Sequence, residues 1–117
     1  RVGGGALLMA RDEEGWTPHM RACEKGMLEA VRIMSQHGGH ELMLVQGRAG
    51  WNALMCASAN GHNAVVEHLL EVGPADQILV KSGTGTTALA LAEKYKKEET
   101  VALINKHINR MVHPDLH

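Results

Sequence analysis

Histidine is the residue type in this chain with the clearest capacity for metal chemistry. The sequence holds eight His, and two pairs are closely spaced, His37-x-x-His40 and His113-x3-His117. A structural zinc site needs four ligands in a closed tetrahedral set, and no Cys pair accompanies either His pair. A Gly-Gly turn separates the first pair, and Pro114 interrupts the second. We therefore expect no metal site and no cofactor.

Cysteine is the second candidate for chemistry, as a nucleophile or as half of a disulfide. The chain has two, Cys23 and Cys56, and neither belongs to a C-x-x-C pair. This pattern does not indicate a disulfide framework, and it favours reduced, buried thiols in an intracellular, cytoplasmic protein. Cys23 would need a neighbouring base and a cleft to react, but it falls on an apolar helix face. We interpret it as a structural thiol.

The hydroxyl-rich segment Ser-Gly-Thr-Gly-Thr-Thr at 82–87 could cradle a phosphate ahead of a helix. It lacks the lysine and the preceding buried strand of a phosphate-binding loop, so we favour a turn followed by a helix N-cap. G-x-S-x-G and H-E-x-x-H motifs are also missing from the sequence. The sequence therefore predicts a protein that is not an enzyme.

Composition limits the fold and the partners. The 117 residues suffice for one domain, and 44% of them are hydrophobic, although two Trp and one Tyr are the only aromatic residues. Many small residues and seven Met suit closely packed short helices. The net charge of −1 gives no basic field for nucleic acid, and no apolar run is long enough for a membrane span. The chain starts with Arg1 and without a leader pattern, so we expect a piece of a longer protein.

One segment is written three times at a fixed spacing of 35 residues. The copy at 50–61 opens with Gly-Trp and ends at a glycine, the copy at 15–26 does the same, and a third copy follows at 85–96. Such internal repetition is typical of stacked repeat proteins. In the third copy Lys96 stands where Gly26 and Gly61 stand in the others.

Each copy predicts a pair of helices. Thr17, Asn52 and Thr87 are the expected N-caps of the first helices. We expect second helices at 28–37, 63–72 and from 98 to about 109, and extended segments with protruding turns at 41–49 and 76–84. The apolar residues expected to face the core from the second helices are Leu28, Val31, Ile33, Met34, Val65, Val66, Leu69, Leu70, Val101, Ile104 and Ile108.

Residues 15–22, Gly-Trp-Thr-Pro-His-Met-Arg-Ala, resemble the ankyrin-repeat motif G-x-T-P-L-H-x-A. The second copy matches further, with Asn-Gly-His at 60–62 and Gly-Pro-Ala-Asp at 73–76. The resemblance covers roughly residues 12–108 and implies an all-α, ankyrin-type helix-turn-helix solenoid with short hairpin-like finger loops. We divide the single domain 1–117 into the tail of a preceding repeat (1–11), repeat 1 (12–46), repeat 2 (47–81), repeat 3 (82–109) and a tail (110–117).

The sequence also departs from the family pattern. Met20, Met55 and Ala90 replace the motif histidine, so its hydrogen bonds to neighbouring repeats are lost. His19 replaces the usual buried leucine. The period is 35 residues, and the two residues beyond the family's usual length fall in the loops between helix pairs. His62 follows the repeat glycine, where the family has a structural histidine.

The resemblance implies a non-enzymatic protein–protein interaction module that presents a concave surface, the palm, and a row of finger loops to a protein partner. An alternative is a set of regulatory repeats that packs on a catalytic domain of a larger chain. We expect a monomer that binds neither nucleic acid nor membrane. The positions carried over from the family as protein-binding are Glu13, Glu14, Trp16, Glu24, Lys25, Arg48, Trp51, Ala59, Asn60, Thr84, Thr86 and Tyr95, with Ala49, Gly83 and Lys94 beside them.

Two interpretations of the finger residues stay open at this stage. Trp16 and Trp51 occupy the same repeat position, where they could anchor a partner or simply cover a neighbouring loop. The acidic run 12–14 could meet a basic patch on a partner, with Arg48 and Lys81 making the later fingers mildly basic. The simpler interpretation of these charges is a solvated turn.

Overall fold

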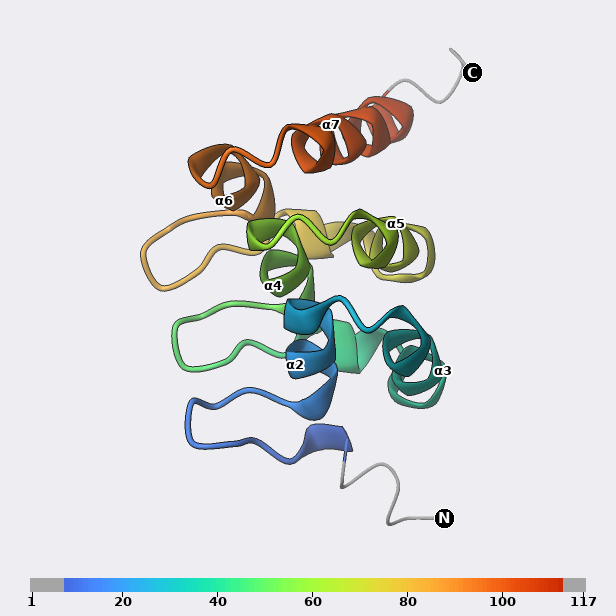
Figure 1. The fold of residues 1–117 in the computed structure, drawn as a ribbon, viewed down its shortest axis with the longest axis vertical. Coiled ribbons are helices and arrows are strands. Elements are labelled where there is room, and N and C mark those ends of the chain that lie inside the picture. The colour runs from blue at the N-terminus through green and yellow to red at the C-terminus, as the bar shows by residue number, and fades with distance from the viewer. Residues whose placement is uncertain (1–7, 113–117) are drawn as a thin grey trace.

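The computed structural model describes residues 8–112, which fold into short helices joined by loops without any strand. Figure 1 shows an elongated stack in which the helices lie in two rows and three loops project to one side. The helices are α2 (Pro18–Lys25), α3 (Leu28–Leu44), α4 (Ala53–Ala59), α5 (Asn63–Val72), the 3₁₀ helix η1 (Ala75–Ile78), α6 (Ala88–Lys94) and α7 (Glu98–Val112).

The two rows follow from the repeat. The short helices α2, α4 and α6 pack on one another to form the inner row, and α3, α5 and α7 form the outer row behind them. Each inner helix also packs against the outer helix that follows it in sequence. The predicted all-α, ankyrin-type solenoid is therefore confirmed, whereas the boundaries that we drew between repeats stay a prediction.

The inner helices all begin in the same way. The side chains of Thr17, Asn52 and Thr87 each accept a hydrogen bond from the backbone N–H three residues ahead, at 3.2, 3.0 and 3.2 Å. Such a cap satisfies one of the free N–H groups at a helix start, and its loss costs about 1 kcal/mol. All three predicted N-caps are thus confirmed.

The core is centred on α4. Every residue of this helix is buried, because α2 covers it on one side and α6 on the other. Cys56 on α4 and Cys23 on α2 are free and buried, and burial raises the pKa of both thiols. The prediction of a buried Cys23 thiol is confirmed.

The turn between the inner and outer helix of a repeat requires a left-handed residue. Gly26 and Gly61 have φ of 71° and 68°, and a Cβ on either would lie 2.5 Å from His62 or 2.9 Å from Lys97 of the next repeat. Lys96 adopts the same conformation, with φ 59°, although the left-handed region costs a non-glycine residue about 1 kcal/mol. Within the described part of the chain no further repeat packs on Lys96. The left-handed backbone therefore favours glycine at this position, but no neighbouring side chain excludes a Cβ there.

The outer helix of repeat 1 ends at the Gly-Gly pair 38–39, as predicted, because Gly39 is not helical, with φ of 65° and ψ of −159°. The element α3 spans this kink and includes a second helical stretch that continues to Leu44. Residues 41–44, predicted to be extended, are helical. Extended chain would have pointed Leu42 and Met43 to opposite sides, whereas the helical turn leaves them only 0% and 1% exposed.

The second connecting segment shows the same correction. Residues 75–78, of which we predicted all but the first to be extended, form the 3₁₀ helix η1 directly after Pro74. This turn buries the neighbours Gln77 and Ile78 together, and Gln77 donates to the Leu69 carbonyl at 2.7 Å. Helical turns therefore replace the predicted extended chain over 41–44 and 76–78.

The outer row mostly presents the predicted faces. Val65, Val66, Leu69, Leu70 and Ile104 are buried, and Leu28, Met34, Val101 and Ile108 are half-buried. The prediction that Ile33 faces the core is wrong, since its side chain is 54% exposed. The buried residues of this part of α3 are Val31 and Ser35, four apart on one helix face, and Ile33 lies off that face.

His19 is buried at the position where the family has leucine. Its Nε2 lies 3.0 Å from Ser35 Oγ, and its Nδ1 has no hydrogen-bond partner within the described residues. Burial, and secondarily the charge of His68, lowers the pKa of His19 to about 4. The imidazole is therefore neutral at pH 7, which permits its place in the core.

This histidine predicts a loss of stability in mild acid. The unfolded chain binds a proton at His19 near pH 6.5 but the folded chain only near pH 4, so the free energy of unfolding falls as pH drops through this window. We expect His19 to contribute a loss of about 3 kcal/mol between these limits.

Urea unfolding at several pH values checks this expectation. The double variant His19→Leu, Ser35→Ala should lose most of the acid slope, because the fully buried imidazole of His19 is gone. His68 and His107, whose pKa values are also lowered by burial, account for the residual slope. An unchanged slope in the double variant would contradict the assignment.

Candidate protein-binding surface

The three projecting loops are fingers of identical construction. In each finger the N–H of the first residue donates to the carbonyl of the fifth residue at 2.9 Å. The N–H of the fourth residue, a glycine, donates to the carbonyl of the first at 2.8–2.9 Å. The fingers are 12–16, 47–51 and 82–86, spaced by the 35-residue period. The hairpin-like finger loops predicted from the sequence are therefore present in all three copies.

Neighbouring fingers are joined to one another. The Arg48 N–H donates to the Glu14 carbonyl at 3.1 Å, and the Gly83 N–H donates to the Ala49 carbonyl at 2.9 Å. Side chains add equivalent bonds, since Arg11 donates to the Gln46 carbonyl at 2.9 Å and Gln46 donates to the Lys81 carbonyl at 3.0 Å. The fingers therefore form one continuous edge.

The first residue of each finger organises its interior. Asp12 Oδ1 accepts from two backbone N–H groups of finger 1, and Ser82 Oγ does the same in finger 3. Finger 2 has Gly47 at this position, and a Cβ there would lie 2.3 Å from Trp16 Cδ1. The Trp16 indole therefore occupies the space that a side chain at residue 47 would need.

Trp16 and Trp51 stack with ring centroids 6.1 Å apart and an angle of 24° between their planes. Both indoles are half-buried against the core. Trp16 covers the loop of the next finger, as one interpretation required, and its ring also remains partly accessible. Coverage of a loop and a part in binding are thus compatible for these residues.

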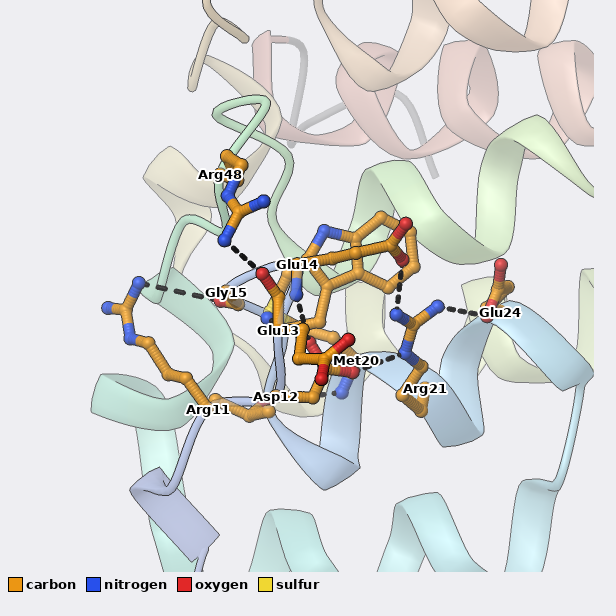
Figure 2. Close-up of polar contacts among 11 residues, drawn as sticks. Arg11, Asp12, Glu13, Glu14, Gly15, Met20, Arg21, Glu24 and Arg48 are labelled. Atoms are coloured by element: carbon orange, nitrogen blue, oxygen red, sulfur yellow. Dashed lines mark hydrogen bonds and ion pairs between the residues drawn. The ribbon is translucent and has the colours of Figure 1, made fainter.

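Arg21 on α2 fixes the other side of Trp16. Its guanidinium lies 4.4 Å from the Trp16 ring centroid and binds Asp12 at 2.7 Å, Glu24 at 3.1 Å and Glu14 (Figure 2). The hydrogen bond from Arg21, followed by that from the Trp16 N–H, lowers the pKa of Asp12. Two of the three acidic side chains of finger 1 therefore bond one cation of the same repeat. Arg48 reaches the Glu13 carbonyl from the next finger.

The inner row and the fingers enclose a hollow of about 560 Å³, which we call the Trp hollow. Tyr95 at its far end is 46% exposed, and Lys94 Nζ lies 5.5 Å from the centroid of the Tyr95 ring. The residues that line the Trp hollow are Trp16, Glu24, Ala49, Trp51, Ala59, Asn60, Tyr95 and Lys97.

The structure brings together half of the twelve residues that the sequence singled out. Trp16, Glu24, Trp51, Ala59, Asn60 and Tyr95 line the Trp hollow. Glu13, Lys25 and Arg48 are exposed outside it, and Glu14 is held by Arg21. Thr84 and Thr86 bond Ser82 within finger 3, so the hydroxyl-rich segment is a finger turn, with Thr87 as the cap of α6.

Sequence reasoning missed two residues of this surface, Lys97 and Arg21. Lys97 occupies the repeat position of His62, one residue after the helix-pair turn, so the 35-residue period could have placed it. Arg21 stands between the acidic run 12–14 and Glu24 in sequence, but the sequence alone does not show that it would bind three carboxylates together.

Two histidines lie within hydrogen-bond distance of backbone carbonyls from another part of the stack. His62 Nε2 lies 2.8 Å from the Glu24 carbonyl, which confirms its predicted packing role, and His40 Nε2 lies 3.0 Å from the Val72 carbonyl. Among residues 8–112 no group of three or more His, Cys, Asp or Glu side chains has the arrangement of a metal site. The pair His113 and His117 lies outside the described residues.

The fold is that of a stacked helical-repeat protein, with an aromatic-lined hollow between its inner helices and its fingers. No helix among residues 8–112 has both the length and the apolar character of a membrane span. A family model described as "Ankyrin repeats (3 copies)" matches residues 4–79 and, in a second placement, 39–113. The chain belongs to the ankyrin-repeat family, whose members are generally protein-interaction modules.

Solved structures support the same fold. The chain is similar to one in the "Crystal Structure of the Yeast Ribosomal Protein Rps3 in Complex with its Chaperone Yar1", with a TM-score of 0.81 and 23% identity over 90% of this chain and 75% of that one. In all, 359 chains of solved structures match, so the fold alone does not single out a function. No curated protein sequence matches the chain.

The contact between Trp16 and Gly47 generates a prediction. Gly47→Ala should displace the indole and destabilise the protein by about 1–3 kcal/mol, the usual cost of overpacking. In a Trp16→Ala background the same substitution should cost less than half as much, because the clashing ring is absent. Urea unfolding of the four proteins measures this coupling. Equal costs in both backgrounds would contradict the proposed contact.

Proposed function

We propose that this protein is a non-enzymatic binding module that holds a partner protein in the Trp hollow and along the fingers. The observation that carries the proposal is the gathering of three aromatic side chains, Trp16, Trp51 and Tyr95, in one solvent-accessible hollow. These are all the aromatic residues of the chain. Both indoles are only half-buried against the core and Tyr95 is 46% exposed, so the three rings leave aromatic surface that a partner can cover.

The chemistry of the Trp hollow suits a protein partner. Tryptophan and tyrosine supply large contact areas at low entropic cost and are enriched among residues that dominate binding energy. Glu24, Asn60 and Lys97 add polar groups at the rim, where they give orientation and specificity. The hydrogen bonds between fingers support a preformed surface, which lowers the cost of ordering on binding.

Site-specific cross-linking tests the proposal. A photoreactive amino acid replaces Ala49, which lines the Trp hollow, or Ala102, another exposed alanine, on α7. In an extract of the source cells we expect Ala49 to trap a defined protein that Ala102 does not trap. Trp51→Ala should weaken the binding of this protein about 30-fold, as expected for an interface anchor.

The controls separate binding from unfolding. The Trp51→Ala variant must keep the helical circular-dichroism spectrum of the unaltered chain. Ala49→Arg is a second variant, which should fill the Trp hollow from an exposed finger position and removes no core side chain. The proposal fails if positions 49 and 102 trap the same proteins, or if both folded variants bind the trapped protein as well as the unaltered chain.

A further inference from the structure

We propose that the Trp hollow takes an extended segment of the partner with three side chains in a fixed order: basic beside α2, large and apolar or aromatic beside α4, and acidic beside α6. This inference rests on the proposed function and adds the chemistry and the polarity of the partner. It follows from the unequal charges at the two ends of the Trp hollow.

The α2 end is acidic despite the arginine there. Arg21 binds three carboxylates, which leaves two negative charges without a compensating cation in this cluster. Glu14 and Glu24 each use Oε1 for Arg21, and within the described part of the chain Oε2 of neither accepts a hydrogen bond. Because these side chains are 66% and 33% exposed, an incoming ammonium or guanidinium group can reach the remaining oxygens.

The α6 end is basic. Lys97 lines the Trp hollow, and Lys94 lies over the Tyr95 ring. Neither lysine forms an ion pair with another residue in the range 8–112, where all three ion pairs belong to Arg21. A carboxylate of the partner would therefore find free counter-charges at this end.

The middle of the Trp hollow is apolar. Arg21, Trp16 and Trp51 follow one another in a stack, with 4.4 Å from the guanidinium to the first ring and 6.1 Å between the rings. Ala49 and Ala59 have small side chains beside Trp51, so the volume of about 560 Å³ remains open there. A large apolar or aromatic side chain fits such a space and extends the stacked surface.

The spacing of the three features sets the length of the segment. Packed helix axes lie 8–10 Å apart, so α2 and α6, on either side of α4, are separated by roughly 16–20 Å. An extended chain advances about 3.3 Å per residue. The basic and acidic residues of the partner should therefore lie about five or six positions apart, with the apolar residue between them.

Selection from a library of short random peptides tests this inference on the 117-residue chain. Peptides are kept if they bind the unaltered protein and do not bind the Ala49→Arg variant. We expect these peptides to share the predicted order and spacing, and Lys97→Glu to weaken a selected peptide by about tenfold. Replacing the acidic residue of the peptide by lysine should restore the binding of that peptide to the Lys97→Glu variant.

Lys106→Glu on α7 makes the same change of charge outside the Trp hollow and should alter binding by less than about twofold. If peptides require the Trp hollow but show no charge order, or if Lys97→Glu and Lys106→Glu act alike, this inference is wrong and the proposed function stands. If no peptide that binds the unaltered protein loses its binding in Ala49→Arg or in Trp51→Ala, both are wrong.

Discussion

Each repeat of this protein is completed by the repeat that follows it. The glycine at the turn of one repeat lies against a side chain of the next, at Gly26–His62 and at Gly61–Lys97. The carbonyls of one finger accept hydrogen bonds from the next finger. Together these contacts fix the distance and the register between repeats. The two rows of helices and the line of fingers follow from this register.

The Trp hollow is a consequence of the same register. Residues at one repeat position line up on one surface, so two tryptophans that are 35 residues apart in the sequence become stacked neighbours. Arg21 then holds one ring in place from the side, together with three carboxylates. A surface assembled in this way is preformed, and its chemistry changes along its length because each repeat contributes different charges. This gives the module both its aromatic surface and its polarity.

Much of the architecture could be predicted from the sequence, because it depends on local signals that recur with a fixed period. The caps at Thr17, Asn52 and Thr87 and the turn glycines are such signals. The errors occurred where long-range packing decided the local structure. The helical turn after Gly39 forms because Leu42 and Met43 are buried together, and no local sequence pattern predicts this turn. The aromatic part of the site followed from the period, whereas the ion cluster of Arg21 depended on side-chain geometry that the sequence does not encode locally.

The hydrogen bonds between neighbouring fingers should hold the three loops together as one rigid surface. Amide hydrogen exchange tests it most directly, at the Arg48 and Gly83 N–H groups that donate to the preceding finger. We expect these amides to exchange at least ~100-fold more slowly than that of Ala49, which has no backbone partner among the described residues. This ratio corresponds to an opening free energy of about 2.7 kcal/mol. Exchange at all three amides as fast as in an unstructured peptide would contradict this expectation.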